Sequence, residues 1–260
     1  EETQKRGLNR AEHRLHLRCE LPHHTTLPLF EKLVGREPVS LVSLMDHSPG
    51  QRQFANIEKY REYYQGKYAL NDAEMARYEE EQLQLAARWS QPNRLSIAAM
   101  CRDRNIALAS HDDATHDHVR ESHQLGSVIA EFPTTFEAAE ASRKHGMNVL
   151  MGAPNIVRGG SHSGNVAASK LASLGLLDIL SSDYYPASLL DAAFRVADDE
   201  GNSFTLPQAI RLVTKNPASA LNLHDRGEIA EGKRADLVLA HRKGEHIHID
   251  HVWRQGKRVF

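Results

Sequence analysis

The feature that most constrains the fold is a short apolar run that ends in a histidine and two acids. Residues Ile106–Ser110 are apolar or small, and His111, Asp112 and Asp113 follow directly. A continuous apolar run of this length, after the turn-like residues Asp103–Asn105, is typical of a buried parallel strand. Chemistry in parallel α/β folds lies at the carboxyl ends of such strands. The run therefore predicts an α/β fold with His111 at the rim of an active site.

Three further apolar runs end in the same kinds of residue. They are Leu15–Glu20, which ends in Glu20, Ser40–His47, which ends in Asp46 and His47, and Asp178–Asp183, which ends in Asp183. Zinc and harder divalent cations take mixed imidazole and carboxylate ligands, and catalytic sites leave one position open for water. The four strand ends together predict a divalent-metal site. For any one of these residues the alternative is a loop or surface role, and the chain's 16 histidines keep that alternative open.

The two acids that follow His111 suggest a second role at the same rim. An acid next to a metal-binding histidine can act as a general base or can orient that histidine. Asp112 is the candidate for this catalytic role.

A glycine-rich loop predicts an anion site. Free backbone N–H groups at the start of a helix attract anions, and an arginine adds a planar cation suited to phosphate. The alternative is that the glycines merely turn the chain. The candidate substrate-binding residues are Arg158, Gly159, Gly160, Ser161, His162 and Asn165.

Composition bounds the class of protein. The chain has 260 residues, of which 40% are hydrophobic and 25% charged, as in ordinary globular proteins. The formal net charge of -2 gives no bulk attraction to nucleic acid or to a membrane. Two cysteines offer no disulfide framework, which fits a reducing cytoplasm, and no apolar run is long enough to span a bilayer.

Residues 1–223 are expected to form the α/β part, and residues 224–260 short β segments of a small β domain. Residues 56–93 are rich in Tyr, Glu, Gln and Arg and predict an inserted helical hairpin, with Asn71 and Glu74 as a capping box. A further helix is expected over 93–104. The insertion either covers the site as a lid or supports the fold as a solvated helical pair. Besides the strands at Ile106–Ser110 and Asp178–Asp183, strands are expected over Arg14–Glu20, Val39–Met45, Ser127–Pro133, Asn148–Asn155, Asp236–Ala240, Ile247–Asp250 and Val252–Phe260.

The chain resembles the amidohydrolase superfamily, and within it the branch that degrades phosphonates. The resemblance extends over essentially the whole chain. It rests on Ser43–Gln51, Ser110–Thr115, Glu131–Thr135, Gly152–Asn165, Ser181–Pro186, Asn216–Leu221 and Gly227–Leu239.

The resemblance implies a metal-dependent (β/α)8 barrel with a β-sandwich built from both chain ends. It implies one or two divalent cations, Zn or Mn, held by Glu20, His47, His111 and Asp183. Asp183 would also accept the proton of the attacking water. The loop from Arg158 to Asn165 would hold part of a phosphate-rich substrate.

One departure from the family pattern concerns the start of the barrel. The family's first barrel strand carries a metal-binding His-x-Asp or His-x-His pair, and we recognise no such strand at the start of this sequence. A complete barrel needs roughly 250 residues before any β domain is added. We therefore expect a C-terminal piece of the enzyme with fewer than eight parallel strands, inactive or poorly active alone.

The resemblance implies a cytoplasmic hydrolase that releases pyrophosphate from the triphosphate of a ribose phosphonate and leaves the 5-monophosphate. Its partner is this small molecule, with no nucleic acid or membrane. Association with other phosphonate-pathway enzymes and homo-oligomerisation are left open. The rival functions are a cyclic amidase or deaminase on the same scaffold, and a non-catalytic subunit of a phosphonate-processing complex.

Overall fold

The computed structural model describes residues 2–36, 39–161 and 164–260. These residues divide into two compact units, Leu15–Val149 and a second that joins Glu1–Arg14 to Leu150–Phe260. The division differs from the expected one, and the expected boundary between 223 and 224 stays a prediction. The described residues contain one sheet of six parallel strands, fewer than eight as expected, and neighbouring strands in this sheet are consecutive in the chain.

Four parallel strands organise the unit Leu15–Val149. They are β1 (Leu15–Glu20), β2 (Val39–Met45), β3 (Ala107–His111) and β4 (Ile129–Glu131). The helices of this unit are α2 (Thr26–Val34), the 3-10 helix η1 (Arg52–Phe54), α3 (Ile57–Tyr68), α4 (Asp72–Asp103), α5 (His116–Gln124) and α6 (Phe136–Lys144).

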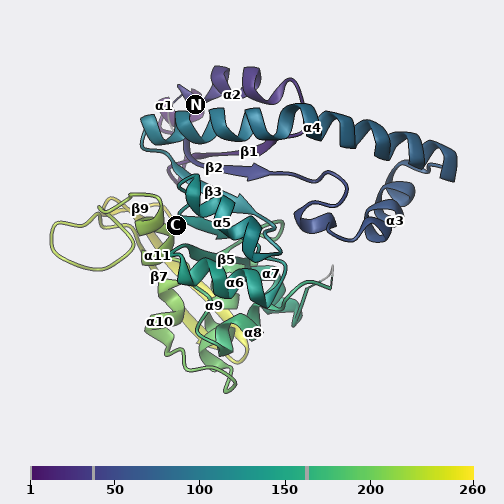
Figure 1. Cartoon of the computed structure of the whole chain (residues 1–260). Coiled ribbons are helices and arrows are strands. Elements are labelled where there is room, and N and C mark those ends of the chain that lie inside the picture. The colour runs from purple at the N-terminus through teal and green to yellow at the C-terminus, as the bar shows by residue number, and fades with distance from the viewer. Residues whose placement is uncertain (1, 37–38, 162–163) are drawn as a thin grey trace. The chain divides into compact units, whose positions relative to one another are not determined.

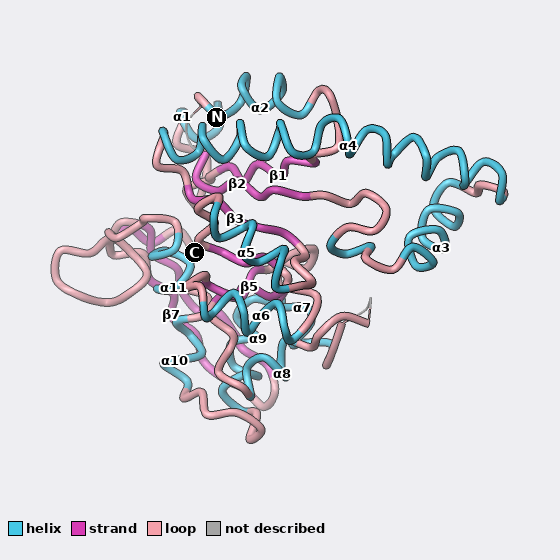
Figure 2. The backbone as a smooth tube through the Cα atoms, in the orientation of Figure 1, coloured by secondary structure: helices cyan, strands magenta, loops and turns pink. Residues whose placement is uncertain are grey.

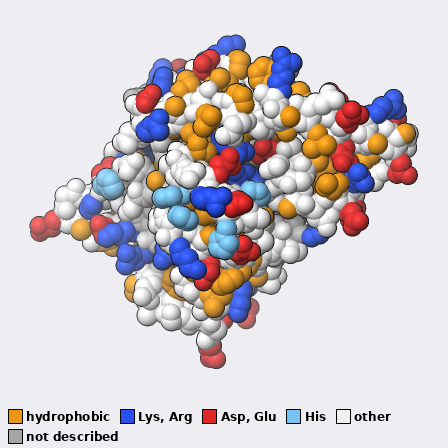
Figure 3. All heavy atoms as spheres, viewed as in Figure 1, with side chains coloured by type: hydrophobic (Ala, Val, Ile, Leu, Met, Phe, Trp, Pro, Cys, Tyr) orange, Lys and Arg blue, Asp and Glu red, His pale blue; other side chains and the backbone are white. Residues whose placement is uncertain are grey.

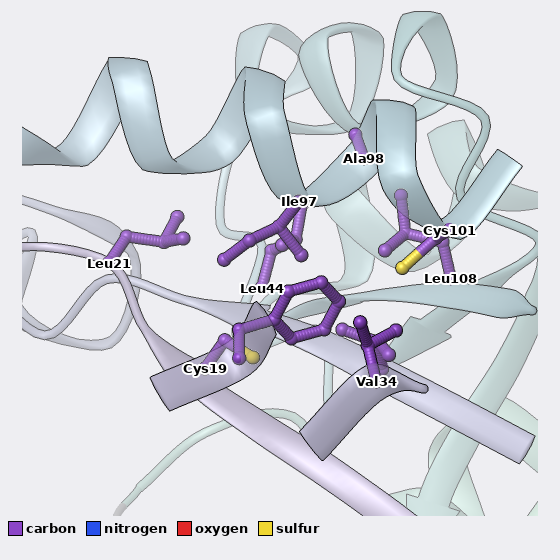
Figure 4. Close-up of a cluster of buried hydrophobic side chains, with 10 residues drawn as sticks. Cys19, Leu21, Val34, Leu44, Ile97, Ala98, Cys101 and Leu108 are labelled. Atoms are coloured by element: carbon purple, nitrogen blue, oxygen red, sulfur yellow. The ribbon is translucent and has the colours of Figure 1, made fainter. Parts of the chain in front are cut away.

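The two faces of the sheet differ because side chains alternate along a strand. On one face Val42, Leu44 and Leu108 pack against helix α4, which contributes Ile97 (Figure 4). Helices α2 and α4 lie together on this side of β1 and β2 (Figure 1). Truncating a fully buried residue such as Ile97 to alanine costs about 2–5 kcal/mol in cores of this kind.

The opposite face is polar at the carboxyl ends of the strands. The parallel register pairs Arg18 with Ser43, Glu20 with Met45 and His111 with Glu131. Residues paired in this way point to the same face, so one face collects acids, imidazoles and an arginine. This face carries the candidate site.

The helical insertion differs from its prediction at one point. The capping box of Asn71 and Glu74 is present, but α4 continues without interruption to Asp103, although Pro92 lies inside it. The predicted second helix over 93–104 is therefore the end of the same helix. Directly after Pro92, the side chain of Asn93 donates to the carbonyl oxygens of Leu21 and His23, which fastens α4 to the end of β1. Figure 2 shows α4 as one continuous helix joined to α3.

The second unit carries the remaining two parallel strands and a small antiparallel sheet. The first of these parallel strands begins just before the boundary between the units. The unit's helices are α1 (Glu2–Lys5), α7 (Ala153–Arg158), α8 (Ala168–Ser173), α9 (Ser188–Asp198), α10 (Leu206–Arg211) and α11 (Lys215–Ala220). Its strands are β5 (Asn148–Gly152), β6 (Ile179–Ser181), β7 (Leu237–Lys243), β8 (His246–Arg254) and β9 (Lys257–Arg258). The two segments predicted over 247–250 and 252–260 are thus mainly one strand, β8, followed by a turn.

Ion pairs join the start of the chain to its end within this unit. Glu12 accepts hydrogen bonds from Arg226 at 3.1 Å and Arg234 at 2.7 Å, and Arg254 donates to the carbonyl oxygen of Asn9. The hydrogen bond from Arg234 lowers the pKa of Glu12 to about 2. No helix among the residues that the structure describes is both long and apolar enough to cross a membrane.

Because the pKa of Glu12 falls below its unfolded value of 4.5, its contribution to stability is fully present above pH 4.5 and is lost as the pH falls towards 2. We expect Glu12→Gln to lower the free energy of unfolding at pH 7 by roughly 0.5–1 kcal/mol, a modest value because the group is partly solvated. Urea unfolding at pH 7, 4 and 3 should show this difference shrinking. The exposed Glu231→Gln is the control, and a difference that does not depend on pH would contradict the assignment.

Candidate metal centre

His47, His111 and Asp112 converge at the carboxyl ends of β2 and β3. The two imidazole rings lie edge to face with centroids 5.7 Å apart. The Nε2 atoms of His47 and His111 lie 3.5 and 3.3 Å from the same oxygen, Asp112 Oδ2. One candidate ligand atom from each residue lies within 4.8 Å of the other two. Asp112 has a positive φ of 56°, a backbone conformation that aspartate adopts more readily than most residues.

The Nδ1 atom of each imidazole is hydrogen-bonded to a carboxylate. Nδ1 of His47 lies 2.6 Å from Glu20 Oε2, and the backbone N–H of His47 donates to Glu20 Oε1. Nδ1 of His111 lies 2.7 Å from Glu131 Oε2. A carboxylate accepts the Nδ1 proton, so the Nε2 atom of each ring faces Asp112. In His47 this atom carries a proton at neutral pH, which a bound cation would displace. Two such nitrogens and one carboxylate are a donor set that zinc and manganese both accept, so the residues present fit a divalent cation.

The pKa shifts agree with these contacts. Burial disfavours the charged imidazole of His47, but the hydrogen bonds to Asp112 and Glu20 outweigh it and raise the pKa of His47 to about 9. Burial raises the pKa of Glu131, but the hydrogen bond from His111 outweighs it and leaves that pKa below its usual value. The pKa of Glu20 is lowered in the same way by His47. Both carboxylates are therefore ionised acceptors at neutral pH.

Glu131 is a site residue that the sequence analysis missed. It is buried at the end of β4 and accepts from Ser43 Oγ at 2.7 Å as well as from His111. Ser43 Oγ in turn lies 2.6 Å from Nε2 of His16. The sequence did contain a signal for Glu131, because Ile129–Glu131 is another short apolar run that ends in an acid. The contact to His111 arises only because β3 and β4 are neighbours in register.

A buried ionic network lies directly behind the site. Arg52 pairs with Asp113 and with Glu121, and Arg94 pairs with Glu121 and with Asp46. Asp46 precedes His47 in the chain and Asp113 follows Asp112. Asp46 therefore anchors its loop to helix α4. The network fixes the backbone on both sides of the candidate ligands, because buried charges hold their partners in one geometry.

Aromatic residues of the helical insertion reach the site through Phe54. The Phe54 ring lies edge-on to His47, with centroids 6.2 Å apart, and packs against Tyr60, Tyr63 and Tyr64. Helix α3 therefore packs against Phe54, which in turn lies against the ring of His47. A moving lid stays a prediction.

Asp183 belongs to the other compact unit. It follows β6 with a positive φ of 48° and lies beside Gly152 at the end of β5, where an added Cβ would come 3.3 Å from Asp183 Oδ2. Its position at a strand's carboxyl end is as expected. Its membership in a common cluster with Glu20, His47 and His111 stays a prediction.

The predicted anion loop has a different local structure. Arg158 ends helix α7 rather than preceding a helix, and the N–H groups of Gly159 and Gly160 donate to carbonyl oxygens of Ile156 and Asn155. The prediction of free N–H groups at these glycines is therefore wrong, since both cap the carboxyl end of α7. Arg158 donates to the hydroxyl of Tyr184 at 2.9 Å and is otherwise on the surface.

The other candidate residues of this loop are Ser161, His162 and Asn165. Ser161 Oγ accepts the N–H of Asn165, and His162 lies outside the described residues. On the face drawn in Figure 3, basic and acidic side chains are interspersed.

Replacing the residues around His111 should change metal binding in a graded way. We expect His111→Ala to abolish tight Zn²⁺ or Mn²⁺ binding, and Glu131→Gln to weaken it about 10- to 100-fold, because a neutral amide oxygen holds the Nδ1 proton less strongly than a carboxylate does. Competition with a chromogenic chelator measures both. His123→Ala, an exposed histidine on α5, is the control. Unchanged affinity in Glu131→Gln would remove that residue from the site.

Comparisons with known proteins identify relatives of this chain. The α-D-ribose 1-methylphosphonate 5-triphosphate diphosphatase of Escherichia coli (strain K12) is 89% identical over 260 residues, which are all of this chain and 69% of that protein. Adenine deaminase from Ligilactobacillus salivarius (strain UCC118) is 34% identical over 125 residues, 44% of this chain and 21% of that protein.

Among solved structures, dihydropyrimidinase from Brevibacillus agri NCHU1002 aligns with 97% of this chain and 70% of its own, with a TM-score of 0.49 and 12% identity. A model of the amidohydrolase family matches residues 14–260. This match, together with the relative that is 89% identical over all 260 residues of this chain, shows that the chain belongs to the amidohydrolase family.

Proposed function

We propose that this chain is the metal-binding part of a hydrolase that cleaves α-D-ribose 1-methylphosphonate 5-triphosphate to the 5-monophosphate and pyrophosphate. The observation that carries the proposal is its 89% identity to the E. coli diphosphatase over all 260 residues. The donor set of His47, His111 and Asp112 supports it. The proposal includes a (β/α)8 barrel to which β1–β6 belong, and a cytoplasmic location without nucleic-acid or membrane partners.

In this proposal His47, His111 and Asp112 hold a divalent cation, Zn or Mn. Glu20 and Asp183 are proposed as further ligands. Glu20 already accepts two hydrogen bonds from His47, and a carboxylate retains further lone pairs for a cation. A divalent cation supplies acidification of a water and neutralisation of phosphoryl charge.

The chain's own groups supply the proton chemistry and the orientation. Glu20 and Glu131 keep the Nδ1 protons of the two histidines, so both imidazoles stay fixed while substrate binds. Asp183 is proposed to accept the proton of the attacking water, and Asp112 is the second candidate for that role because its carboxylate lies between the two histidines. Arg158 is proposed to contact an outer phosphate, together with Ser161, His162 and Asn165.

Pyrophosphate release by the intact protein tests the proposal directly. Asp183→Asn should keep substrate affinity but lose roughly 100- to 10,000-fold in kcat, the usual contribution of a general base. Asp199→Asn, an exposed aspartate whose carboxylate accepts the N–H of Gly201, is the control. Near-normal turnover by Asp183→Asn would exclude Asp183 as the base. Turnover of a cyclic amide or of adenine, with none of the triphosphate, would favour the rival amidase or deaminase function.

Arg158→Ala should raise KM for the triphosphate about tenfold and leave kcat nearly unchanged, because a charge-assisted contact to an outer phosphate is made equally in ground and transition states. Steady-state kinetics on the triphosphate and on an uncharged analogue separate the two cases. Arg211→Ala, an exposed arginine on α10, controls for loss of surface charge. An equal rise in KM for both substrates would make Arg158 a structural residue.

A further inference from the structure

Arg18 lies on the polar face of β1, two residues before Glu20, and its guanidinium reaches the candidate metal centre. Its NH2 lies 3.2 Å from Nε2 of His111, and its Nε donates to the sulfur of Met45 at 3.3 Å. Since Nδ1 of His111 gives its proton to Glu131, Nε2 carries a lone pair and accepts from Arg18. The guanidinium thus contacts the same atom that faces Asp112.

The two nearest acids of the polar face bond to other side chains, not to Arg18. Both oxygens of Glu20 accept from His47, and Glu131 accepts from His111 and Ser43. Among the described residues of the unit Leu15–Val149, no carboxylate lies within the 4.0 Å ion-pair distance of Arg18. A thioether and a neutral imidazole are its two partners, and neither carries a negative charge. Arg18 is therefore a positive charge beside the site without an anion to neutralise it.

One lone pair on His111 Nε2 cannot serve a guanidinium and a cation together. With a cation bound, the N–H groups of Arg18 need another acceptor in the immediate surroundings of that cation. A phosphoryl oxygen satisfies both requirements, because guanidinium groups and divalent cations each bind phosphate oxygens strongly.

We propose that Arg18 binds a phosphoryl oxygen of a polyphosphate beside the His47–His111–Asp112 centre and offsets charge that develops there during cleavage. The choice of a polyphosphate rests on the proposed function. Arg18 is then a catalytic residue close to the reacting phosphorus. The guanidinium fork donates two parallel hydrogen bonds to one phosphate, which lysine cannot do.

Calorimetric binding of inorganic tripolyphosphate to the intact protein, both as purified and after removal of metal, tests this proposal without turnover. Arg18→Met keeps the apolar stem and removes the charge, and it should weaken binding tenfold or more. Arg18→Lys keeps the charge and should lie between the two. Arg36→Met, an exposed arginine before β2, should bind as the wild type does. If Arg18→Met does not fold, Arg18→Gln replaces it.

A second readout separates substrate contact from a structural role. Arg18→Met frees Nε2 of His111 and removes a like charge, so Zn²⁺ should bind at least as tightly as to the wild type. Tripolyphosphate affinity that is absent in the wild type, or equal in the wild type and Arg18→Met, would overturn the proposal, as would loss of Zn²⁺ binding. If anion binding depends on Arg18 but the intact protein releases no pyrophosphate, the proposed substrate fails and the anion site stands.

Discussion

The hydrogen bonds from two imidazoles to two carboxylates are the interaction on which the candidate site depends. Glu20 and Glu131 each hold the Nδ1 atom of one histidine, at 2.6 and 2.7 Å, and so turn both Nε2 atoms towards Asp112. Without them each ring could rotate or change tautomer, and the donor set would disperse. The arrangement needs neighbouring parallel strands in one register, because each acid and each histidine comes from a different strand end.

The rest of the unit keeps those strand ends in place. The apolar face of the sheet packs on α4, and the same helix carries Arg94, which reaches Asp46 next to His47. Arg52 holds Asp113 in the corresponding position beside Asp112. One helix therefore connects the hydrophobic core to the polar rim, so that packing energy on one face of the sheet supports ligand geometry on the other. Phe54 likewise joins the helical insertion to the site, because its ring packs edge-on against His47.

Sequence reasoning predicted what depends on local pattern. The strand ends at Glu20, His47 and His111 follow from apolar runs, and the capping box at Asn71 follows from residue type and spacing. What depends on pairing between distant segments was missed, as with Glu131, Arg18 and the network of Arg52 and Arg94. Glycines after Arg158 were interpreted as an anion cradle because a helix start and a helix end both favour glycine, and only the backbone hydrogen bonds tell them apart. The helix expected over 93–104 is the end of α4, which continues past Pro92 where Asn93 donates hydrogen bonds to the carbonyl oxygens of Leu21 and His23.

The central claim is that His47 and His111 bind a catalytic cation through their Nε2 atoms. Anomalous diffraction from crystals of the Zn²⁺-loaded intact protein, recorded on both sides of the zinc absorption edge, tests it most directly. The account predicts one strong anomalous peak at about 2.0–2.1 Å from each of the two Nε2 atoms, with a carboxylate oxygen of Asp112 in the same shell. Zinc bound elsewhere, with both imidazoles free of it, would contradict the account.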